Sequence, residues 1–253
     1  GTTGYEEAAA QGLLAGINAA LKSSEKEAFI LSRQESYIGV LIDDLTTLGT
    51  NEPYRMFTSR AENRLKLRED NADQRLTKYG FELGIVKQEI YKGFCERREQ
   101  IYFEKDRIKS LWLNPTPQTN ALLSSAALPE ISTHVTLDAY LKRPEVNIRL
   151  LKKTGLLSDF DLRVLRCVEI ESKYEGYIRR EETQSEKLKH LDNVWIPSRI
   201  DYHQISGLSK EVVEKLKKHS PSTLGQASRI SGITPAAVTL LHISIQKSDV
   251  MVS

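Results

Sequence analysis

The feature that most constrains the fold is a long segment with almost no helix breakers. Residues 87–112 contain one glycine and no proline, and Phe94, Ile101 and Ile108 recur every seven residues. Apolar residues at this spacing lie on one face of an α-helix, so the segment predicts a long, half-exposed helix. A second long helical region is expected over roughly 159–191.

Other local signals also favour helices, and no strand-like alternation persists after about residue 60. Capping signals predict helix starts at Thr3 with Glu6, Ser59 with Glu62, Asp73, Ser209, Ser220 with Pro221, and Thr234 with Pro235. Residues 113–135 contain three prolines and several Ser and Thr, which makes them the best candidate linker. We therefore expect an all-α chain, or nearly so.

Composition excludes several classes of protein. The 253 residues carry a formal net charge of +2, and no apolar run approaches the roughly 18–20 residues that a bilayer helix needs. Cys95 and Cys167 lack CxxC spacing, and the five scattered histidines lack the spacing of metal ligands. There is no dinucleotide-binding GxGxxG or Walker loop, and no secretory signal. We expect a cytoplasmic chain without a metal site or an activated thiol.

Two clusters near the start suggest binding. The helix expected after Thr3 would present free backbone amides, which attract phosphate or a polarised carbonyl, although a well-capped packing helix explains it too. Arg55 precedes Arg60, Arg64 and Arg68, which are four residues apart. On one helical face these three side chains would suit phosphates, while the interspersed acids equally suit a solvated, salt-bridged face.

Two further clusters lie in the second half. Lys173, Tyr174 and Tyr177 surround a helical glycine, a combination that suits either core packing or close approach and stacking by a nucleic acid. Residues 205–209 and 230–234 form a weak internal repeat with a glycine turn before each helix, similar to helix-hairpin-helix modules. Nearby Lys215, Lys217, Lys218 and Arg229 add positive charge.

Taken together, six segments resemble the GidA/MnmG family of flavoproteins that modify the wobble uridine of tRNA. They are residues 1–20, 36–77, 141–146, 173–178, 201–209 and 225–237, in the family's order, with weaker agreement across 85–135. The resemblance implies that the chain is the C-terminal portion of a longer enzyme. It would comprise the tail of an FAD-binding α/β domain (1–35), a helical domain with an arginine-rich tRNA face (36–135) and a helical subdomain for tRNA and the GTPase MnmE (136–253).

The resemblance also implies an activity. With MnmE, the whole enzyme would add a carboxymethylaminomethyl or aminomethyl group to C5 of the uridine, using FAD, NADH and methylenetetrahydrofolate. The nucleotide-binding loop and catalytic cysteines would precede this chain, so the chain alone is expected to be inactive, to contain no catalytic residue and to bind no cofactor tightly. Family members are homodimers.

Site residues follow from the same resemblance. Thr3, Gly4 and Tyr5 would complete the flavin pocket. The tRNA-binding residues would be Arg55, Arg60, Arg64, Arg68, Lys173, Tyr174, Tyr177 and Arg229. Two departures weaken individual contacts, because the family usually has Tyr in place of Asn63 and Arg in place of His203.

Two alternatives from other classes remain. A non-enzymatic helical adaptor would use its basic face only as a solubilising surface. A generic helix-hairpin-helix DNA binder would depend on the turns at Gly207 and Gly232 and would leave residues 1–80 unexplained.

Overall fold

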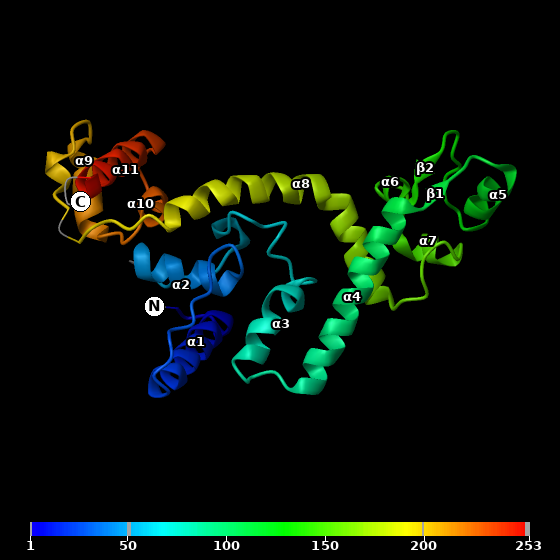
Figure 1. Cartoon of the computed structure of the whole chain (residues 1–253), viewed down its shortest axis with the longest axis horizontal. Coiled ribbons are helices and arrows are strands. Elements are labelled where there is room, and N and C mark those ends of the chain that lie inside the picture. The colour runs from blue at the N-terminus through cyan, green and yellow to red at the C-terminus, as the bar shows by residue number, and fades with distance from the viewer. Residues whose placement is uncertain (1, 50–51, 199, 251–253) are drawn as a thin grey trace. The chain divides into compact units, whose positions relative to one another are not determined.

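The computed structural model describes residues 2–49, 52–198 and 200–250, and it confirms a mostly helical fold (Figure 1). The α-helices are α1 Tyr5–Ser23, α2 Tyr37–Thr47, α3 Ala72–Glu82, α4 Gln88–Ser110, α5 Pro117–Ser125, α6 Leu137–Leu141, α7 Ile148–Lys153, α8 Leu162–Asp192, α9 Lys210–His219, α10 Leu224–Arg229 and α11 Pro235–Val250. Short 3-10 helices span Thr58–Arg60 and Tyr202–Gln204. In the described residues, strands β1 (Trp112–Leu113) and β2 (Val135–Thr136) form one small antiparallel pair.

The chain forms two compact units. One contains residues 65–180, and the other contains residues 1–64 together with residues 181–253. These units differ from the three consecutive segments expected from the sequence, because residues after 180 pack with the N-terminal segment. The expected boundary at 135 instead falls inside the core of the unit 65–180.

The core of the unit 65–180 is built around α4. Ile101 and Ile108, which the seven-residue spacing placed on one face, are at most 1% exposed, and Phe94 is 2% exposed. Residues 113–135 are not a linker, because they include α5 and contribute buried side chains to this core. The prolines that suggested a linker include Pro117, which starts α5 behind the capping hydroxyl of Thr116.

The C-terminal helices enclose a second core. Ser209 caps α9 and Thr234 caps α11, as predicted, and Val212, Val213 and Leu216 are buried. The predicted start at Ser220–Pro221 is wrong. Ser220 has a left-handed backbone (φ 44°), and α10 begins at Leu224 behind its cap Thr223.

The internal repeat is present in the structure. In each copy an isoleucine carbonyl, Ile205 or Ile230, accepts a hydrogen bond from the amide three residues later, and the third residue is a glycine at φ 95° or 87°. A side chain at Gly207 would meet Leu240, and one at Gly232 would meet Lys215; each partner lies eight residues after the turn glycine of the other copy. The two copies therefore contact each other reciprocally.

Replacing Gly207 with alanine is expected to destabilise this bundle by about 1–2 kcal/mol, because the left-handed backbone disfavours a Cβ. The added carbon would also lie 2.9 Å from Leu240. Thermal unfolding would measure the change. Gly93→Ala is the matched control: Gly93 lies within α4 with open space around its Cα, so that variant should be neutral or stabilised by up to ~1 kcal/mol. Equal melting temperatures for the two variants would contradict the strained turn.

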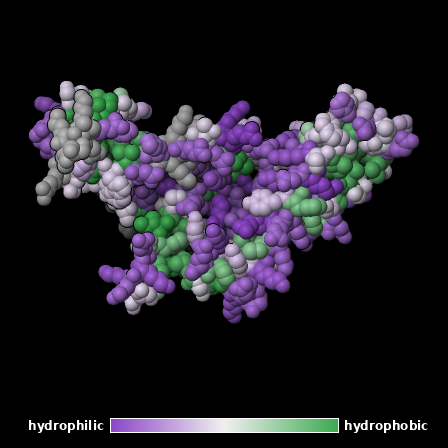
Figure 2. Space-filling view, in the orientation of Figure 1, coloured by the Kyte–Doolittle hydropathy of each residue, from purple (hydrophilic) through white to green (hydrophobic). Residues whose placement is uncertain are grey.

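The N-terminal segment contributes α1 and α2, which pack against each other. An apolar run of the sequence forms α2 over Tyr37–Thr47, and the Ser36 hydroxyl accepts a hydrogen bond from the Gly39 amide. Apolar surface is visible over α1 and α2 (Figure 2). Leu13 of α1 and Ile30 of the segment that connects the two helices are both exposed. Gly12 and Gly16 lie inside α1, and a Cβ at either position would meet no other described residue within 4 Å, so no described contact explains these two glycines.

Candidate flavin contact and nucleic-acid interface

The start of α1 lacks the predicted capping box. Gly4 is the N-cap, no described side chain caps it, and Thr3 and Glu6 do not bond each other's backbone as the pattern predicted. Glu7 holds the start of α1 in place instead. Its side chain is 4% exposed, accepts a hydrogen bond of 2.8 Å from the Met56 amide and forms an ion pair of 3.2 Å with Arg55. The Met56 amide lowers the pKa of Glu7, and Arg55 contributes in the same direction.

These contacts join the start of α1 to the segment before Thr58. Thr2 forms a parallel bridge with Tyr54, and the Gln11 amide donates to the Thr2 hydroxyl. Gly4 is buried, and any side chain there would collide with the Glu7 carboxylate. One oxygen of Glu7 (Oε2) is buried without a hydrogen-bond partner. Of the predicted flavin residues, Thr3 and Tyr5 are exposed on either side of Gly4.

The predicted arginine-rich helix is absent. After the 3-10 turn Thr58–Arg60, residues 61–71 form turns, so Arg60, Arg64 and Arg68 do not share a helical face. The reason is that their guanidinium groups bond backbone carbonyls that a helix would satisfy with its own amides. Arg60 donates to the Arg55 carbonyl, Arg64 to those of Ala61 and Ser59, and Arg68 to that of Leu65.

Part of this cationic segment still faces solvent. The Arg55 side chain is 57% exposed despite its ion pair with Glu7. The Arg60 guanidinium lies 4.3 Å from the centre of the Tyr54 ring. Arg68 is paired with Asp70 at 2.9 Å. The assignment of these residues to tRNA binding stays a prediction.

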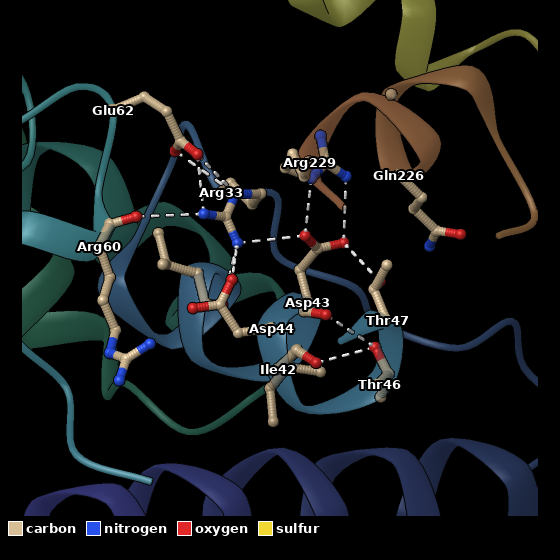
Figure 3. Close-up of polar contacts among 12 residues, drawn as sticks. Arg33, Ile42, Asp43, Asp44, Thr46, Thr47, Arg60, Glu62, Gln226 and Arg229 are labelled. Carbon is tan, nitrogen blue, oxygen red and sulfur yellow. Dashed lines mark hydrogen bonds and ion pairs between the residues drawn. The ribbon is translucent and has the colours of Figure 1, made fainter. Parts of the chain in front are cut away.

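Sequence reasoning missed the most connected arginine, Arg33 (Figure 3). Its side chain is 9% exposed and forms ion pairs with Asp43, Asp44 and Glu62. It also donates to the carbonyls of Val40 and Arg60. Burial alone would lower the pKa of Arg33, but these carboxylates, Glu62 foremost, raise it above its usual value.

The same acids engage residues on either side. The Tyr54 hydroxyl donates to Asp44 at 2.7 Å, and burial together with this carboxylate raises the pKa of Tyr54. Arg229 of α10 pairs with Asp43 at 3.1 Å (Figure 3) and with Asp192 at 2.8 Å. Arg229 thus connects α10 to α2 and to the end of α8. The sequence did contain a signal for Arg33, the Asp43–Asp44 pair within an apolar run, because buried carboxylates need cationic partners.

The cluster at 173–178 lies on α8, along which hydrophilic residues predominate in Figure 2. Lys173 bonds the Val146 carbonyl and pairs with Glu169, so its ammonium is used internally. Tyr174 and Tyr177 are 43% and 59% exposed, with ring centres 6.4 Å apart. The Arg180 guanidinium lies 5.9 Å from the Tyr177 ring, and a groove of about 430 Å³ runs beside these residues.

Glu175 is neutralised at this surface. Lys142 and Lys109 approach its carboxylate at 2.8 and 2.9 Å. Hydrogen bonds from these two ammonium groups lower the pKa of Glu175 to about 2. The acid therefore stays ionised but paired. Tyr174, Tyr177 and Arg180 face solvent, as does Arg179, whose side chain is 78% exposed and lies 3.9 Å from Glu175.

The remaining expectations concern single residues. Asn63 is 5% exposed, so it offers no stacking surface, and His203 is exposed. Burial raises the pKa of the Cys167 thiol. Within the described ranges, no cluster of His, Cys, Asp or Glu suits a metal ion. No described helix combines the length and the apolar character needed to cross a membrane.

Comparison with known proteins gives three consecutive family matches. Residues 1–27 match Glucose inhibited division protein A, residues 88–182 the tRNA modifying enzyme MnmG/GidA C-terminal helical domain, and residues 184–251 the corresponding C-terminal helical bundle. Among solved structures, Aquifex aeolicus GidA in its form II crystal is 47% identical with a TM-score of 0.78, covering 97% of this chain and 38% of that chain. The form I crystal gives 46% identity, a TM-score of 0.75, and 96% and 37% coverage.

These matches define the class as a helical region of a tRNA-modifying enzyme. The chain belongs to the MnmG/GidA family, which confirms the resemblance drawn from its six segments. It spans less than two fifths of the length of the two Aquifex aeolicus chains.

Proposed function

We propose that this chain is the tRNA- and partner-binding C-terminal region of an FAD-dependent enzyme that modifies the wobble uridine of tRNA. The family match supports the enzyme class. The observation that carries the RNA-binding role is the exposed group of Tyr174, Tyr177 and Arg180 on α8. Unstacked RNA bases bind to aromatic rings and guanidinium planes, and cationic side chains hold the phosphates.

The start of α1 fits a contact with FAD. Gly4 is buried against the Glu7 carboxylate, which also bonds the Glu7 amide. No described side chain caps α1, so the amides of Tyr5 and Glu6 are the first-turn donors that we assign to a carbonyl or phosphate. Thr3, Gly4 and Tyr5 would hold the group, while Glu7 fixes the helix start against Met56. FAD supplies the redox chemistry when it is bound. The residues of this chain orient it and shield it from water.

The partners follow from the same proposal. Together with MnmE, the whole enzyme adds a carboxymethylaminomethyl or aminomethyl group to uridine C5, drawing on NADH and methylenetetrahydrofolate. It acts as a cytoplasmic homodimer. Residues 136–253 provide the surface for tRNA and MnmE, and the chain alone binds without turnover. Arg55 and Arg60 are the N-terminal arginines best placed for phosphate. Both are exposed, and each is held in position by a neighbour, Arg55 by Glu7 and Arg60 by the Tyr54 ring.

The test is a titration of a tRNA transcript with the 253-residue chain at fixed salt. Tyr177→Ala is expected to weaken binding about tenfold, since base–aromatic stacking is worth roughly 1–3 kcal/mol. Tyr102→Ala is the matched control, because Tyr102 is 55% exposed on α4 and lies outside the cluster. Equal effects of the two substitutions would contradict the assigned surface. A chain that prefers duplex DNA, or binds neither nucleic acid, would favour the helix-hairpin-helix or adaptor alternative.

A further inference from the structure

The unit 65–180 contains a cavity that is lined by none of the residues proposed to bind tRNA. It lies among α3, α4 and the first part of α8 and has a volume of about 620 Å³. Small-molecule sites span about 300–1,000 Å³, so it has room for a ligand of nucleotide size. Phe94 and Ile101 contribute apolar side chains to the lining, and burial raises the pKa of the Cys167 thiol, which also lines the cavity.

The side chains that line this cavity carry an excess of positive charge after their ion pairs are set aside. Asp70 is paired with Arg68, and Asp73 with Arg97 at 3.0 Å. Arg98, Arg163 and Arg166 also line the cavity. Among the described residues, Arg163 and Arg166 have no ion-pair partner and are exposed. The one lining acid outside these pairs is the exposed Glu69, so the cavity favours an anion.

A buried donor points to a second feature of the ligand. The Gln74 side-chain nitrogen (Nε2) is buried with no hydrogen-bond partner in the described structure. A buried donor without a hydrogen bond costs about 1–3 kcal/mol, and a ligand that supplies an acceptor would recover that energy. Gln74 lines the same cavity as the arginines, which places a neutral donor beside the cationic groups.

Arg98 supplies a stacking surface. Its guanidinium lies 5.2 Å from the centre of the Phe94 ring, which supports it from one side. Guanidinium planes stack on unpaired RNA bases. Arg163 and Arg166 are three residues apart on α8, and side chains at that spacing are neighbours on one helical face. A carboxylate would satisfy the arginines alone, whereas a nucleotide satisfies the charge, the plane and the amide together.

We propose that this cavity binds one unstacked nucleotide of the tRNA. Arg163 and Arg166 hold its phosphates, Arg98 stacks on the base, and the Gln74 amide donates to a base acceptor. This inference rests on the proposed function and adds to it a specific recognition site distinct from the Tyr174–Tyr177 surface.

The test uses the 253-residue chain, a tRNA transcript and fixed salt. Arg163→Glu is expected to weaken binding about tenfold, and Gln74→Leu about fivefold, which corresponds to a lost hydrogen bond of roughly 1 kcal/mol. Arg149→Glu on α7 is the control, because Arg149 is exposed, lies outside the cavity and undergoes the same charge change. It should change the affinity less than twofold. Gln74→Leu should not lower the melting temperature, because it removes an unpaired buried donor.

A second readout locates the ligand. In a Cys95→Ser background, at a pH alkaline enough to ionise part of the Cys167 thiol, alkylation of Cys167 should be slowed by the transcript in the wild-type cavity but not in Arg163→Glu. Equal effects of Arg163→Glu and Arg149→Glu, or an unchanged affinity of Gln74→Leu, would overturn the site. Protection of Cys167 by uridine monophosphate or inorganic phosphate but not by tRNA would assign the cavity to a free anion and also overturn it. If the wild-type chain binds no tRNA, the proposed function itself fails; if it binds but ignores the cavity variants, only this inference fails.

Discussion

Replacing Arg33 with methionine is expected to lower the free energy of unfolding of the unit that contains it by about 4 kcal/mol. Breaking a buried ion pair by removing one partner costs about 3–5 kcal/mol, because the remaining charge is left uncompensated. Arg33 serves three carboxylates, and the Asp44 side chain is only 8% exposed. Hydrogen exchange of α2 amides at increasing urea concentration would measure the loss as earlier opening of that helix.

Two further variants make this prediction specific. Lys26→Met removes an exposed lysine from the same connecting segment and should cost less than about 0.5 kcal/mol. Combining Arg33→Met with Asp44→Asn should cost less than the sum of the two single variants, because both remove the same interaction. A loss below about 1 kcal/mol for Arg33→Met, or strict additivity, would show that the network contributes little.

Replacing Glu104 with alanine is expected to cost about 3 kcal/mol in the unit 65–180. Glu104 is fully buried, pairs with Arg107 at 2.7 Å and accepts a hydrogen bond of 3.1 Å from the Ser158 amide. The substitution leaves the Ser158 amide without this acceptor and Arg107 without its carboxylate partner, although Arg107 still donates to the Leu156 carbonyl. The cost is smaller than for Arg33 because the Arg107 side chain is 29% exposed and water can solvate it. Hydrogen exchange of α4 would report the change.

The control for this site is Glu99→Ala, an exposed position on the same helix, where we expect no loss of protection. Glu104 also predicts a pH dependence. Burial alone would raise its pKa, but hydrogen bonds from Arg107 and Ser158 outweigh burial and lower it below 4.5. Its stabilisation is therefore complete above that value and is lost as the pH falls through the lowered pKa. As the pH falls through this range, the free energy of unfolding should decrease less for Glu104→Gln than for the wild type. An equal decrease in the two proteins would show that Glu104 is not the group responsible for the pH dependence.

The helices were largely predictable from the sequence, but the candidate site was not. The seven-residue spacing of Phe94, Ile101 and Ile108 and the Ser209 cap are local signals, and the structure confirms them. Ser59 and Glu62 give an equally good capping pattern, yet residues 61–71 form turns. There the arginine side chains satisfy the backbone carbonyls, an outcome that the capping pattern does not predict.

The sequence by itself determined the helical class, the glycine turns at 207 and 232, and membership of the MnmG/GidA family, since each depends on spacing or on segments in order. Only the tertiary structure decided which cations are free. Arg229 and Lys173 were assigned to tRNA, yet their side chains bond acids or carbonyls distant in sequence. Arg163 and Arg166, unremarkable in sequence, have no ion-pair partner among the described residues and line a cavity where the described structure leaves the Gln74 side-chain nitrogen unsatisfied. The availability of a charge depends on neighbours that folding brings together, and local sequence does not encode it.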